Sequence, residues 1–370
     1  MKKVLFLIHD LGVGGAEKVL VSLVNHLDKS KFEVHVIALF GGGINEQYLK
    51  PEINYKYVWK HTIPGNSRLM KLLSPEELHR ICIKQEYDIE IAFLESAISR
   101  IISGCPIKHT KLYSWIHIEQ RGPERGAGSF RSYEEAEKCY KKINKIICVS
   151  KNVKECFQHN FPSVSEPVVL HNIVESEKIT ELSKESVDDI CFDGKEILIA
   201  AVGKISKRKG FDRLARIVLR LRTEGYPVHL LALGVGPDQT EIERFIEKNH
   251  ISKYYTFLGY QTNPYKYVAK CDLFVCASLA EGYSTAATEA LIVGTPVCTV
   301  DVSGMKEMLG ENNEWGIITE NNEQALYRGI RELISDKELL GIYKRKAIER
   351  GKTFSVEESL NAIENLLLKE

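Results

Sequence analysis

The sequence has no uninterrupted apolar run close to the roughly 20 residues that a membrane-spanning helix requires. Near the amino end, the apolar residues 4–8 are too few for the apolar region of a signal peptide, so we expect a buried first strand there. Internal repeats and low-complexity segments are also absent. These absences predict a cytoplasmic protein made of ordinary globular domains.

Cysteines spaced as Cys-x-x-Cys are lacking, although the chain holds nine cysteines. Zinc and redox motifs commonly use such pairs, so we expect most of these thiols to be small core residues in a reducing compartment. Net charge is lacking too, because 50 lysines and arginines balance 50 aspartates and glutamates. This balance excludes the basic surface of a protein that grips nucleic acid along its backbone.

What the chain does have is the length and apolar content of two domains. Its 370 residues exceed the usual domain length of roughly 100–150 residues, and 44% of them are hydrophobic. Short apolar runs alternate with amphipathic stretches of helical length, which is typical of a parallel sheet covered by helices, and this alternation occurs twice. We expect two doubly wound α/β domains, at residues 1–180 and 181–352, and a last helix in residues 353–370 that packs back on the first domain.

The expected elements follow from this alternation. In the first half we expect strands near residues 4–8, 33–39, 89–94, 112–116 and 146–149, and helices near 16–27, 69–85, 133–144 and 152–159. In the second half we expect strands near 196–202, 228–233, 255–258, 273–276 and 296–299, and helices near 211–223, 239–248, 265–270, 285–293 and 356–368. The polar segment 175–194 is expected to join the halves. Because open α/β sheets bind ligands at the carboxyl ends of their strands, the chemistry is expected between the two domains.

A glycine-rich turn follows the first expected strand. Gly14 and Gly15 open a helix there, and the free backbone N–H groups of such a helix start suit an anion such as a diphosphate. A dinucleotide-binding fingerprint fits poorly, since Glu17 occupies the position of a small residue and no acidic residue ends the second strand. A tight turn without a ligand remains the alternative interpretation.

Four cations lie between the first strand and the first helix of the second half. They are Lys204, Lys207, Arg208 and Lys209. Positive charge at the amino terminus of a helix opposes the helix dipole, so the arrangement favours a bound anion. A solvated basic loop is the alternative, above all for Lys207 and Arg208.

The most specific segment places two glutamates eight positions apart. Glu281 is expected at the end of a strand, and Glu289 about one turn into the following helix. Gly282 allows close approach of a ligand, and Ser284 and Thr285 are suited to capping the helix. Two carboxylates so placed are too far apart to share a proton, so we interpret them as acceptors for sugar hydroxyl groups.

Together these motifs resemble the family 4 glycosyltransferases. The hallmark of that family is a glutamate, seven residues and a second glutamate within a glycine-rich strand–loop–helix, followed by Gly-Thr-Pro-Val. The resemblance covers nearly the whole chain, in residues 14–17, 115–117, 149–150, 171–174, 202–204, 209–210 and 281–297.

The resemblance implies a GT-B fold, in which two Rossmann-like domains face a central cleft. The second domain would hold a nucleotide-sugar donor, for which we expect a UDP-sugar, and the first a saccharide or lipid-linked saccharide acceptor. Transfer would retain the anomeric configuration and serve the synthesis of bacterial surface polysaccharide, such as capsule or exopolysaccharide. A nucleotide-sugar epimerase of the same fold and a non-catalytic sugar-nucleotide-binding protein are the alternatives.

The resemblance also assigns roles in the second domain. Glu281 would accept hydrogen bonds from donor-sugar hydroxyl groups, and Glu289 would bind the nucleotide ribose. Lys204 and Lys209 match the family's two cations on the diphosphate, although the first is often an arginine, whose two-pronged geometry lysine lacks. The other expected donor-binding residues are Gly15, Gly282, Tyr283, Ser284 and Thr285.

In the first domain, His117 matches the family's histidine near the donor sugar. A histidine at the end of a strand is otherwise equally consistent with a core residue. The expected catalytic residues are Glu281, His117, Lys204 and Lys209. The expected acceptor-binding residues are Gly14, Glu95, His117 and Glu119.

The other large glycosyltransferase fold binds a divalent metal through an Asp-x-Asp motif, which this sequence lacks. We therefore expect no cofactor and no metal. In place of a metal, the two lysines and the amides of Gly14 and Gly15 would stabilise the negative charge that develops on the leaving diphosphate. No motif resembles an activated nucleophile with its base, which disfavours a covalent enzyme intermediate. The resemblance implies front-face attack, the family's usual proposal, in which the leaving phosphate takes the proton of the acceptor, and this absence fits it.

Basic residues accumulate in two stretches of the first half, one in residues 137–145 and one containing Arg68, Lys71, Arg80 and Lys84. A cation close to an anionic leaflet contributes about 1 kcal/mol, so these stretches favour peripheral docking on the inner face of the cell membrane. Ordinary solvated helix faces are the alternative.

Overall fold

The computed structural model describes residues 1–62, 65–190 and 194–369 of the chain, which separates into two compact units. The first unit holds residues 1–173 and the segment from residue 357 onward, and the second holds residues 174–356. The first domain was expected to reach residue 180. Helix α8 (Ser176–Leu182) belongs to the second unit instead, because Ile179 is buried there with Val174 and Tyr265. Residues 191–193 of the expected joining segment lie outside the described residues.

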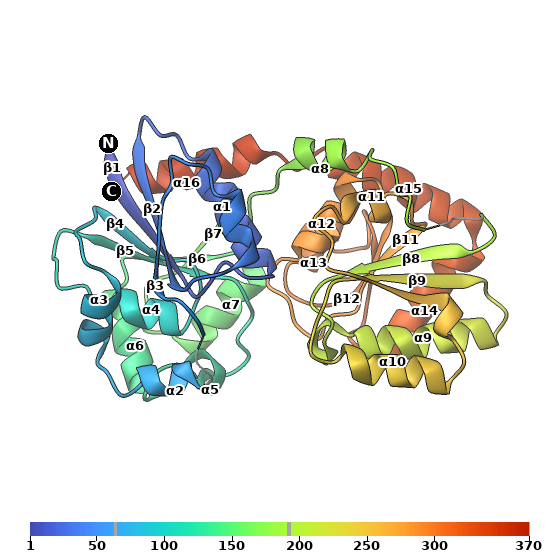
Figure 1. Ribbon diagram of the computed structural model, residues 1–370, viewed down its shortest axis with the longest axis horizontal. Helices are drawn as coiled ribbons and strands as arrows, with labels where there is room; N and C mark the ends of the chain where they lie inside the picture. The colour runs from blue at the N-terminus through green and yellow to red at the C-terminus, as the bar shows by residue number, and fades with distance from the viewer. Residues whose placement is uncertain (63–64, 191–193, 370) are drawn as a thin grey trace. The chain divides into compact units, whose positions relative to one another are not determined.

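The first unit contains a seven-stranded sheet in the order β3-β2-β1-β4-β5-β6-β7, and all the strand pairs are parallel. Its strands are β1 (Lys2–Ile8), β2 (Phe32–Phe40), β3 (Asn54–Trp59), β4 (Ile89–Ala92), β5 (Lys111–Ile116), β6 (Lys145–Cys148) and β7 (Val168–Val169). Its helices are α1 (Gly15–His26), η1 (Ile44–Tyr48), α2 (Asn66–Met70), α3 (Pro75–Cys82), α4 (Ala97–Ile102), α5 (Pro123–Gly126), α6 (Tyr133–Lys142), α7 (Lys151–Asn160) and α16 (Val356–Leu368). In Figure 1, α1 and α16 lie along one face of this sheet and α3, α4 and α6 along the other.

The second unit contains a six-stranded parallel sheet in the order β10-β9-β8-β11-β12-β13. Its strands are β8 (Ile197–Val202), β9 (Val228–Leu233), β10 (Tyr255–Gly259), β11 (Leu273–Cys276), β12 (Val297–Val300) and β13 (Ile317–Thr319). Its other helices are η2 (Lys207–Lys209), α9 (Phe211–Thr223), α10 (Gln239–Lys248), η3 (Ser252–Tyr254), α11 (Tyr265–Val268), α12 (Thr285–Ile292), α13 (Met305–Leu309), α14 (Glu323–Ser335) and α15 (Lys337–Gly351). Figure 1 shows α9, α10 and α14 on one face of this sheet and α11 and α12 on the other.

Burial on both faces explains why the central strands are continuous apolar runs. In β1, every residue from Val4 to Ile8 has no exposed surface, and Val4 lies beside Val34 of β2 and Ile89 of β4. When helices cover both faces of a sheet, its central strands have no solvent-facing side, so polar residues do not alternate with apolar ones. The same property made β1 visible in the sequence.

Every expected strand is present, but three edge strands were not expected. Strand β3 has exposed polar positions, and β7 and β13 have only two and three residues. The helix expected over residues 69–85 is two helices, α2 and α3. Ser74 caps α3, with its Oγ accepting from the backbone N–H of Glu77 at 3.1 Å, and Pro75 directly after it begins the new helix. A residue before proline is disfavoured in helical conformation, so one helix cannot continue through this point.

The last helix, α16, packs in the first unit. Ile363 and Leu367 of its apolar stripe are buried, and the buried Glu364 accepts a hydrogen bond from the backbone N–H of Asp28 at 2.9 Å. Lys31 pairs with the same carboxylate at 2.8 Å. The final segment of the chain is therefore part of the fold of the first unit.

Cysteine burial agrees with the expectation from their spacing. In the described ranges eight cysteines are free thiols, of which Cys105 and Cys156 are half-buried and the others buried, while Cys191 lies outside these ranges. None of the helices in the described parts of the chain is long and apolar enough to cross a membrane.

Candidate functional site

In both sheets the chain order reverses beside the first strand. Strand β1 lies between β2 and β4, and β8 lies between β9 and β11. Ligands of open α/β sheets bind outside the carboxyl ends of the strands at such a reversal. In the second unit, Lys204 follows β8 and Glu281 follows β11; in the first unit, the glycine turn follows β1 and Glu95 follows β4. The candidate residues thus occupy the expected edge of each sheet.

Close backbone packing brings the loops after β8 and β11 together. Gly210 ends the cation loop with φ of +74°, and a Cβ atom there would lie 2.0 Å from the carbonyl oxygen of Ala277 after β11. The backbone N–H of Leu279 also donates to the carbonyl of Arg208 at 2.8 Å. Only glycine fits at residue 210, since any side chain would clash and the backbone is left-handed.

This approach pairs two of the expected catalytic residues. Lys209 Nζ lies 2.6 Å from Glu281 Oε1, and Ser278 Oγ donates to the same oxygen at 2.6 Å. The thiol of Cys276 is 3.9 Å from it. Burial, followed by the negative charge of Glu281, raises the pKa of Cys276, so this thiol stays protonated and donates.

The contacts of Glu281 leave one side of its carboxylate open. The residue is 8% exposed, and among the described residues all its side-chain contacts are made by Oε1, so Oε2 accepts no hydrogen bond. A carboxylate fixed on one oxygen by a cation and a hydroxyl can accept a hydroxyl group of a ligand on the other. Such an arrangement suits the recognition of a sugar.

The structure separates the four cations of the loop. Lys207 pairs with Glu241 at 2.9 Å, and both side chains are more than half exposed, as in a solvated basic loop. Lys204 is exposed, and its ammonium group has no hydrogen bond or ion pair within the described ranges. Lys209, which pairs with Glu281, is the most buried of the four. Arg208 is exposed as well, and its guanidinium has no hydrogen bond or ion pair among the described residues, so the cations left unpaired are Lys204 and Arg208. Lys209 offers its charge to an anion only beside Glu281.

Helix α12 carries the remaining candidates of the second unit. Ser284 Oγ caps this helix by accepting from the backbone N–H of Ala287 at 3.3 Å, and Glu289 Oε1 accepts from Tyr265 Oη at 3.5 Å. Burial raises the pKa of Tyr283 to about 12. Ser284 and Tyr283 are buried, whereas Glu289 and Thr285 are half-buried. The structure thus shows Ser284 shaping the loop after Gly282, and leaves Glu289 more accessible than Glu281.

In the first unit, an aspartate shapes the glycine turn. Asp10 Oδ1 accepts from the backbone N–H of Gly12 at 2.7 Å, while Oδ2 lies 2.6 Å from His9 Nδ1. Gly14 is the amino-terminal cap of α1 in extended conformation, and Gly15 is the exposed first residue of the helix. The carboxylate of Glu17 lies against Gly14, where an added Cβ atom would be 2.0 Å from Glu17 Oε2. A bound anion at this helix start would therefore have to displace that carboxylate.

Backbone strain marks the loop after β4. Ser96 has φ of +67° and ψ of −109°, a combination that costs a non-glycine residue about 1–3 kcal/mol. Its Oγ accepts from Gln120 Nε2 at 3.0 Å. The neighbouring Glu95 Oε2 accepts from the backbone N–H of His117 at 2.8 Å. These contacts join the loops after β4 and β5.

His117 is half-buried as a residue, but its Nε2 atom is buried and has no hydrogen-bond partner within the described chain. Burial lowers its pKa to about 3, so the imidazole is neutral. Its ring lies 4.7 Å from that of Phe93 and stacks on Trp115 at 6.1 Å. A buried polar atom without a partner costs about 1–3 kcal/mol, which a hydroxyl group of a ligand would remove. Trp115 Nε1 beside it is also buried without a partner, so the open nitrogen is consistent with a ligand-binding histidine and with a core residue.

Glu119, the last expected acceptor residue, pairs with Arg121 at 2.9 Å. Its side chain is 14% exposed, whereas that of Arg121 is 64% exposed. Its charge is thus already neutralised by a neighbour in sequence.

Sequence reasoning missed the residues that position the candidates. Ser278 stands three positions before Glu281, and Asp10 stands two positions before Gly12 at the end of a strand. An aspartate that bonds to its own backbone two residues later forms a recognised turn, so Asp10 carried a usable signal. Ser278 and Tyr265 carried none, because their contacts depend on how the loops pack.

Two sequence models of known families match consecutive parts of the chain. The model described as Glycosyltransferase Family 4 matches residues 13–178, and that described as Glycosyl transferases group 1 matches residues 183–353. Between them they span nearly the whole chain.

Among curated proteins, this chain is similar to the N-acetylgalactosamine-N,N'-diacetylbacillosaminyl-diphospho-undecaprenol 4-alpha-N-acetylgalactosaminyltransferase of Campylobacter jejuni. The two are 29% identical over 383 residues, which covers 99% of this chain and 100% of the relative.

Solved structures share the fold at lower identity. The Anabaena protein HepE, in complex with UDP-glucose, is 18% identical and covers 100% of both chains with a TM-score of 0.77. Sucrose-phosphate synthase of Thermosynechococcus elongatus is 15% identical and covers 100% of this chain and 99% of its own, with a TM-score of 0.81. From the paired family matches, the two doubly wound sheets and these relatives, the chain belongs to the family 4-type glycosyltransferases with the GT-B fold.

Proposed function

We propose that this glycosyltransferase moves a sugar from a UDP-sugar to a lipid-linked saccharide, with retention of the anomeric configuration, in the synthesis of surface polysaccharide. The observation that carries the proposal is the carboxylate of Glu281, held on Oε1 by Lys209 and Ser278 and open on Oε2. It offers an acceptor for a sugar hydroxyl group directly beside a cation for a phosphate.

The donor end of the reaction is assigned to the second unit. Lys204 and Lys209 neutralise the diphosphate, on which negative charge grows as the bond to the sugar breaks. Glu281 Oε2 accepts from the sugar, and the more accessible Glu289 accepts from the ribose. In this assignment the ammonium group of Lys209 contacts both the donor phosphate and Glu281. One side chain therefore positions the phosphate and the carboxylate that binds the sugar relative to each other.

His117 is assigned to the reacting sugar. Its buried Nε2 has no partner and the ring is neutral, so it can hydrogen-bond to a hydroxyl group without adding charge. Glu95 acts through the backbone of His117 and belongs with the positioning residues. The leaving phosphate takes the proton of the acceptor hydroxyl group in front-face attack, and no cofactor or metal takes part in transfer.

Two relatives support the choice of substrates. The name of the Campylobacter jejuni protein states that it acts on a saccharide linked through diphosphate to undecaprenol, which favours a lipid-linked acceptor here. The Anabaena structure holds UDP-glucose, which favours a uridine donor. The identity of the transferred sugar is left to experiment.

A lipid-linked acceptor also favours docking on an anionic membrane. Leu69 and Leu72, beside Arg68 and Lys71 at α2, are 53% and 77% exposed. Exposed leucines next to cations suit the interface of a bilayer. In the other basic stretch Lys141 pairs with Glu137 and Lys142 with Glu76, as on an ordinary solvated helix. The docking surface is therefore assigned to residues 68–72.

Incubation with a panel of nucleotide sugars and lipid-linked saccharides, with product detection by mass spectrometry, tests the proposal. The expected result is a product larger by one sugar with UDP-sugars, and nuclear magnetic resonance of that product reports the anomeric configuration. Conversion of the donor without an acceptor would indicate an epimerase. Donor binding without any turnover would indicate a binding protein.

Co-sedimentation with vesicles tests the docking. We expect binding to anionic vesicles at low salt, weakened by high salt and by Leu72→Asp, and little binding to neutral vesicles. The matched control is Leu279→Asp, which changes another exposed leucine of the chain. Equal binding of the wild type and Leu72→Asp would remove residues 68–72 from the interface.

A further inference from the structure

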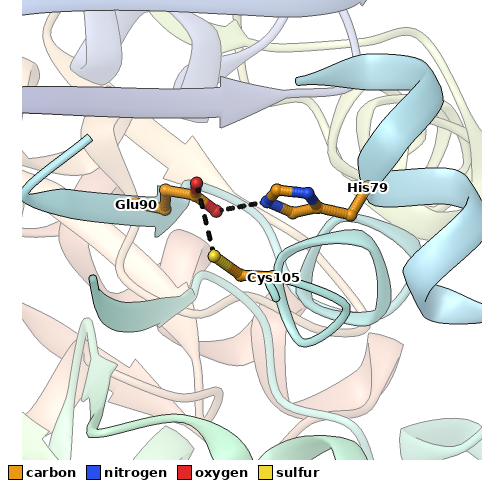
Figure 2. A group of neighbouring side chains, drawn as sticks. All are labelled: His79, Glu90 and Cys105. Carbon is orange, nitrogen blue, oxygen red and sulfur yellow. Dashed lines mark hydrogen bonds and ion pairs between the residues drawn. The ribbon is translucent and has the colours of Figure 1, made fainter. Parts of the chain in front are cut away.

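Three side chains at the other edge of the first sheet have no part in the site described above. His79 lies in the last turn of α3, Glu90 is the second residue of β4, and Cys105 follows α4. Figure 2 shows them converging, with dashed lines from the carboxylate of Glu90 to the imidazole and to the thiol. They lie near the amino ends of the strands, whereas the residues assigned to transfer follow the carboxyl ends.

The separations between the side-chain atoms of this group are close to those between the ligand atoms of a zinc ion. His79 Nε2 lies 2.8 Å from Glu90 Oε2, and Cys105 Sγ lies 3.7 Å from Glu90 Oε1. One ligand atom from each residue lies within 4.8 Å of the others, and the described residues contain no second group of this kind. Zinc bonds of roughly 2.0–2.3 Å in a tetrahedron separate ligand atoms by roughly 3.3–3.8 Å. Small side-chain movements would therefore suffice.

The ligand types select the class of ion. A thiolate and an imidazole with a single carboxylate suit Zn²⁺, whereas Mg²⁺ and Ca²⁺ require several oxygen ligands. The two charges of Zn²⁺ would balance those of the thiolate and the carboxylate. This neutrality matters because His79 is 5% exposed and Glu90 is fully buried, and uncompensated charge is costly there.

A surface pocket borders the group. The pocket has a volume of about 580 Å³ and is lined by His79 itself and by Gly104 and Pro106, which flank Cys105 in sequence. Cys105 is half-buried. Of the three ligands only His79 lines the pocket, so an ion arriving there meets the imidazole first. A water molecule can fill the fourth position that three protein ligands leave open.

We propose that His79 Nε2, a carboxylate oxygen of Glu90 and Cys105 Sγ bind one Zn²⁺ ion. On binding, the Cys105 thiol and His79 Nε2, which donates to Glu90 in the metal-free group, each release a proton to solvent, and the imidazole keeps its proton on Nδ1. The ion ties α3, β4 and the segment after α4 together. Its role is stabilisation of the first unit, distinct from sugar transfer.

Metal binding to the full chain tests this site directly. After removal of metal with a chelator and dialysis against Zn²⁺, we expect about one zinc per chain by elemental analysis and a higher Tm. Co²⁺ in place of Zn²⁺ is expected to give the absorption of a tetrahedral site together with a thiolate-to-cobalt charge-transfer band, which an imidazole–carboxylate pair alone cannot produce.

Matched variants assign the ligands. Cys105→Ser keeps the size of the side chain, and we expect it to remove the charge-transfer band and weaken Co²⁺ binding by roughly tenfold or more. Cys156→Ser changes the other half-buried cysteine among the described residues and is expected to retain the band. Glu90→Gln, nearly isosteric, should weaken binding while keeping the band.

Two results would overturn the proposal. One is a folded wild-type chain that retains no zinc and shows no charge-transfer band with Co²⁺, which would identify the group as a buried ion pair. The other is an identical band in Cys105→Ser, which would place the metal at another thiol. The first result is measured on the wild-type chain alone, so the proposal can be rejected even if every variant fails to fold.

Discussion

The two units use one strand order and place different chemistry at the same position in it. Beside β8 and β11 the second unit holds a partly buried ion pair, Lys209 with Glu281, at 2.6 Å. Beside β1, β4 and β5 the first unit holds a glycine turn and a neutral His117, whose Nε2 has no partner in the described chain. The lysines are concentrated in the second unit, while the first holds an uncharged ring and the carboxylates of Asp10 and Glu95, which accept from backbone N–H groups.

This difference matches the two halves of a glycosyl transfer. Negative charge develops on the leaving diphosphate, and cations fixed in advance stabilise it most effectively. The sugar carries hydroxyl groups, which a neutral imidazole can bind without drawing a counter-ion into the site. Under the proposed assignment one fold serves both tasks, because the loops after its strands vary freely while the sheet stays constant.

The largest expected effect is that of the charged carboxylate in the second unit. Glu281→Ala is expected to raise the transition-state barrier by about 2–4 kcal/mol, or roughly 30- to 900-fold in kcat/KM, because it removes the acceptor for the donor sugar. Steady-state kinetics measures the loss, and Glu241→Ala, which removes the exposed partner of Lys207, is the control. Near-normal kinetics of folded Glu281→Ala would show that this carboxylate does not bind the donor sugar. The contrast between the two units would then have no functional meaning.

Lys209→Gln tests whether the second unit acts on phosphate through charge. We expect binding of UDP to weaken by about 1.5–3 kcal/mol and binding of uridine to change little, because only the diphosphate meets the ammonium group. Calorimetry with the two ligands makes the distinction, with Lys207→Gln as the control in the same loop. Equal weakening for both ligands would mean that Lys209 acts on the fold of the loop.

His117→Asn tests the uncharged side of the comparison. Loss of one hydrogen bond to the sugar in a buried position should cost about 1–3 kcal/mol in kcat/KM. His109→Asn, at an exposed histidine of the same unit, is the control. A loss no greater than that of the control would return His117 to the core-residue interpretation.

The depressed pKa of His117 makes a separate prediction for stability. Because the folded pKa of about 3 lies below the unfolded value of 6.5, the unfolded chain binds the extra proton between these values. The contribution of His117 to folding is therefore lost as pH falls from about 6.5 toward 3, by at most about 1.4 kcal/mol per pH unit. Denaturant unfolding at several pH values should show a shallower acid loss for His117→Asn, and an unchanged slope would contradict the neutral assignment.

The smallest expected effect is that of Ser278, which touches the carboxylate and acts through it. Ser278→Ala is expected to cost about 1 kcal/mol in kcat/KM, since Lys209 still holds the same oxygen. In a Glu281→Ala background the same change should cost almost nothing. A double-mutant cycle measures this coupling, and additive losses would show that Ser278 supports the loop independently of Glu281.

The sequence alone predicted much of this protein. A central strand such as β1 is buried on both faces, so it requires a continuous apolar run that is recognisable in the sequence. Glycine turns and helix starts indicate where such strands end. From these signals Glu281 and the lysines of the cation loop were expected after strands of the second sheet, and the structure places them after β11 and β8. Edge strands such as β3 were not predicted from the sequence, because their exposure to solvent leaves them with polar residues and no apolar run.

What the tertiary structure decided is which distant groups meet. The contact of Lys209 with Glu281 spans 72 positions and depends on Gly210 lying against Ala277, a packing detail that no local pattern encodes. His79, Glu90 and Cys105 come from a helix, a strand and a loop, so their spacing has none of the regularity of a metal motif. Whether His117 is neutral was likewise settled by its burial beside Phe93 and Trp115. Local periodicity records which face of an element is buried, but pairing, burial of single atoms and pKa depend on neighbours that only the folded chain brings close.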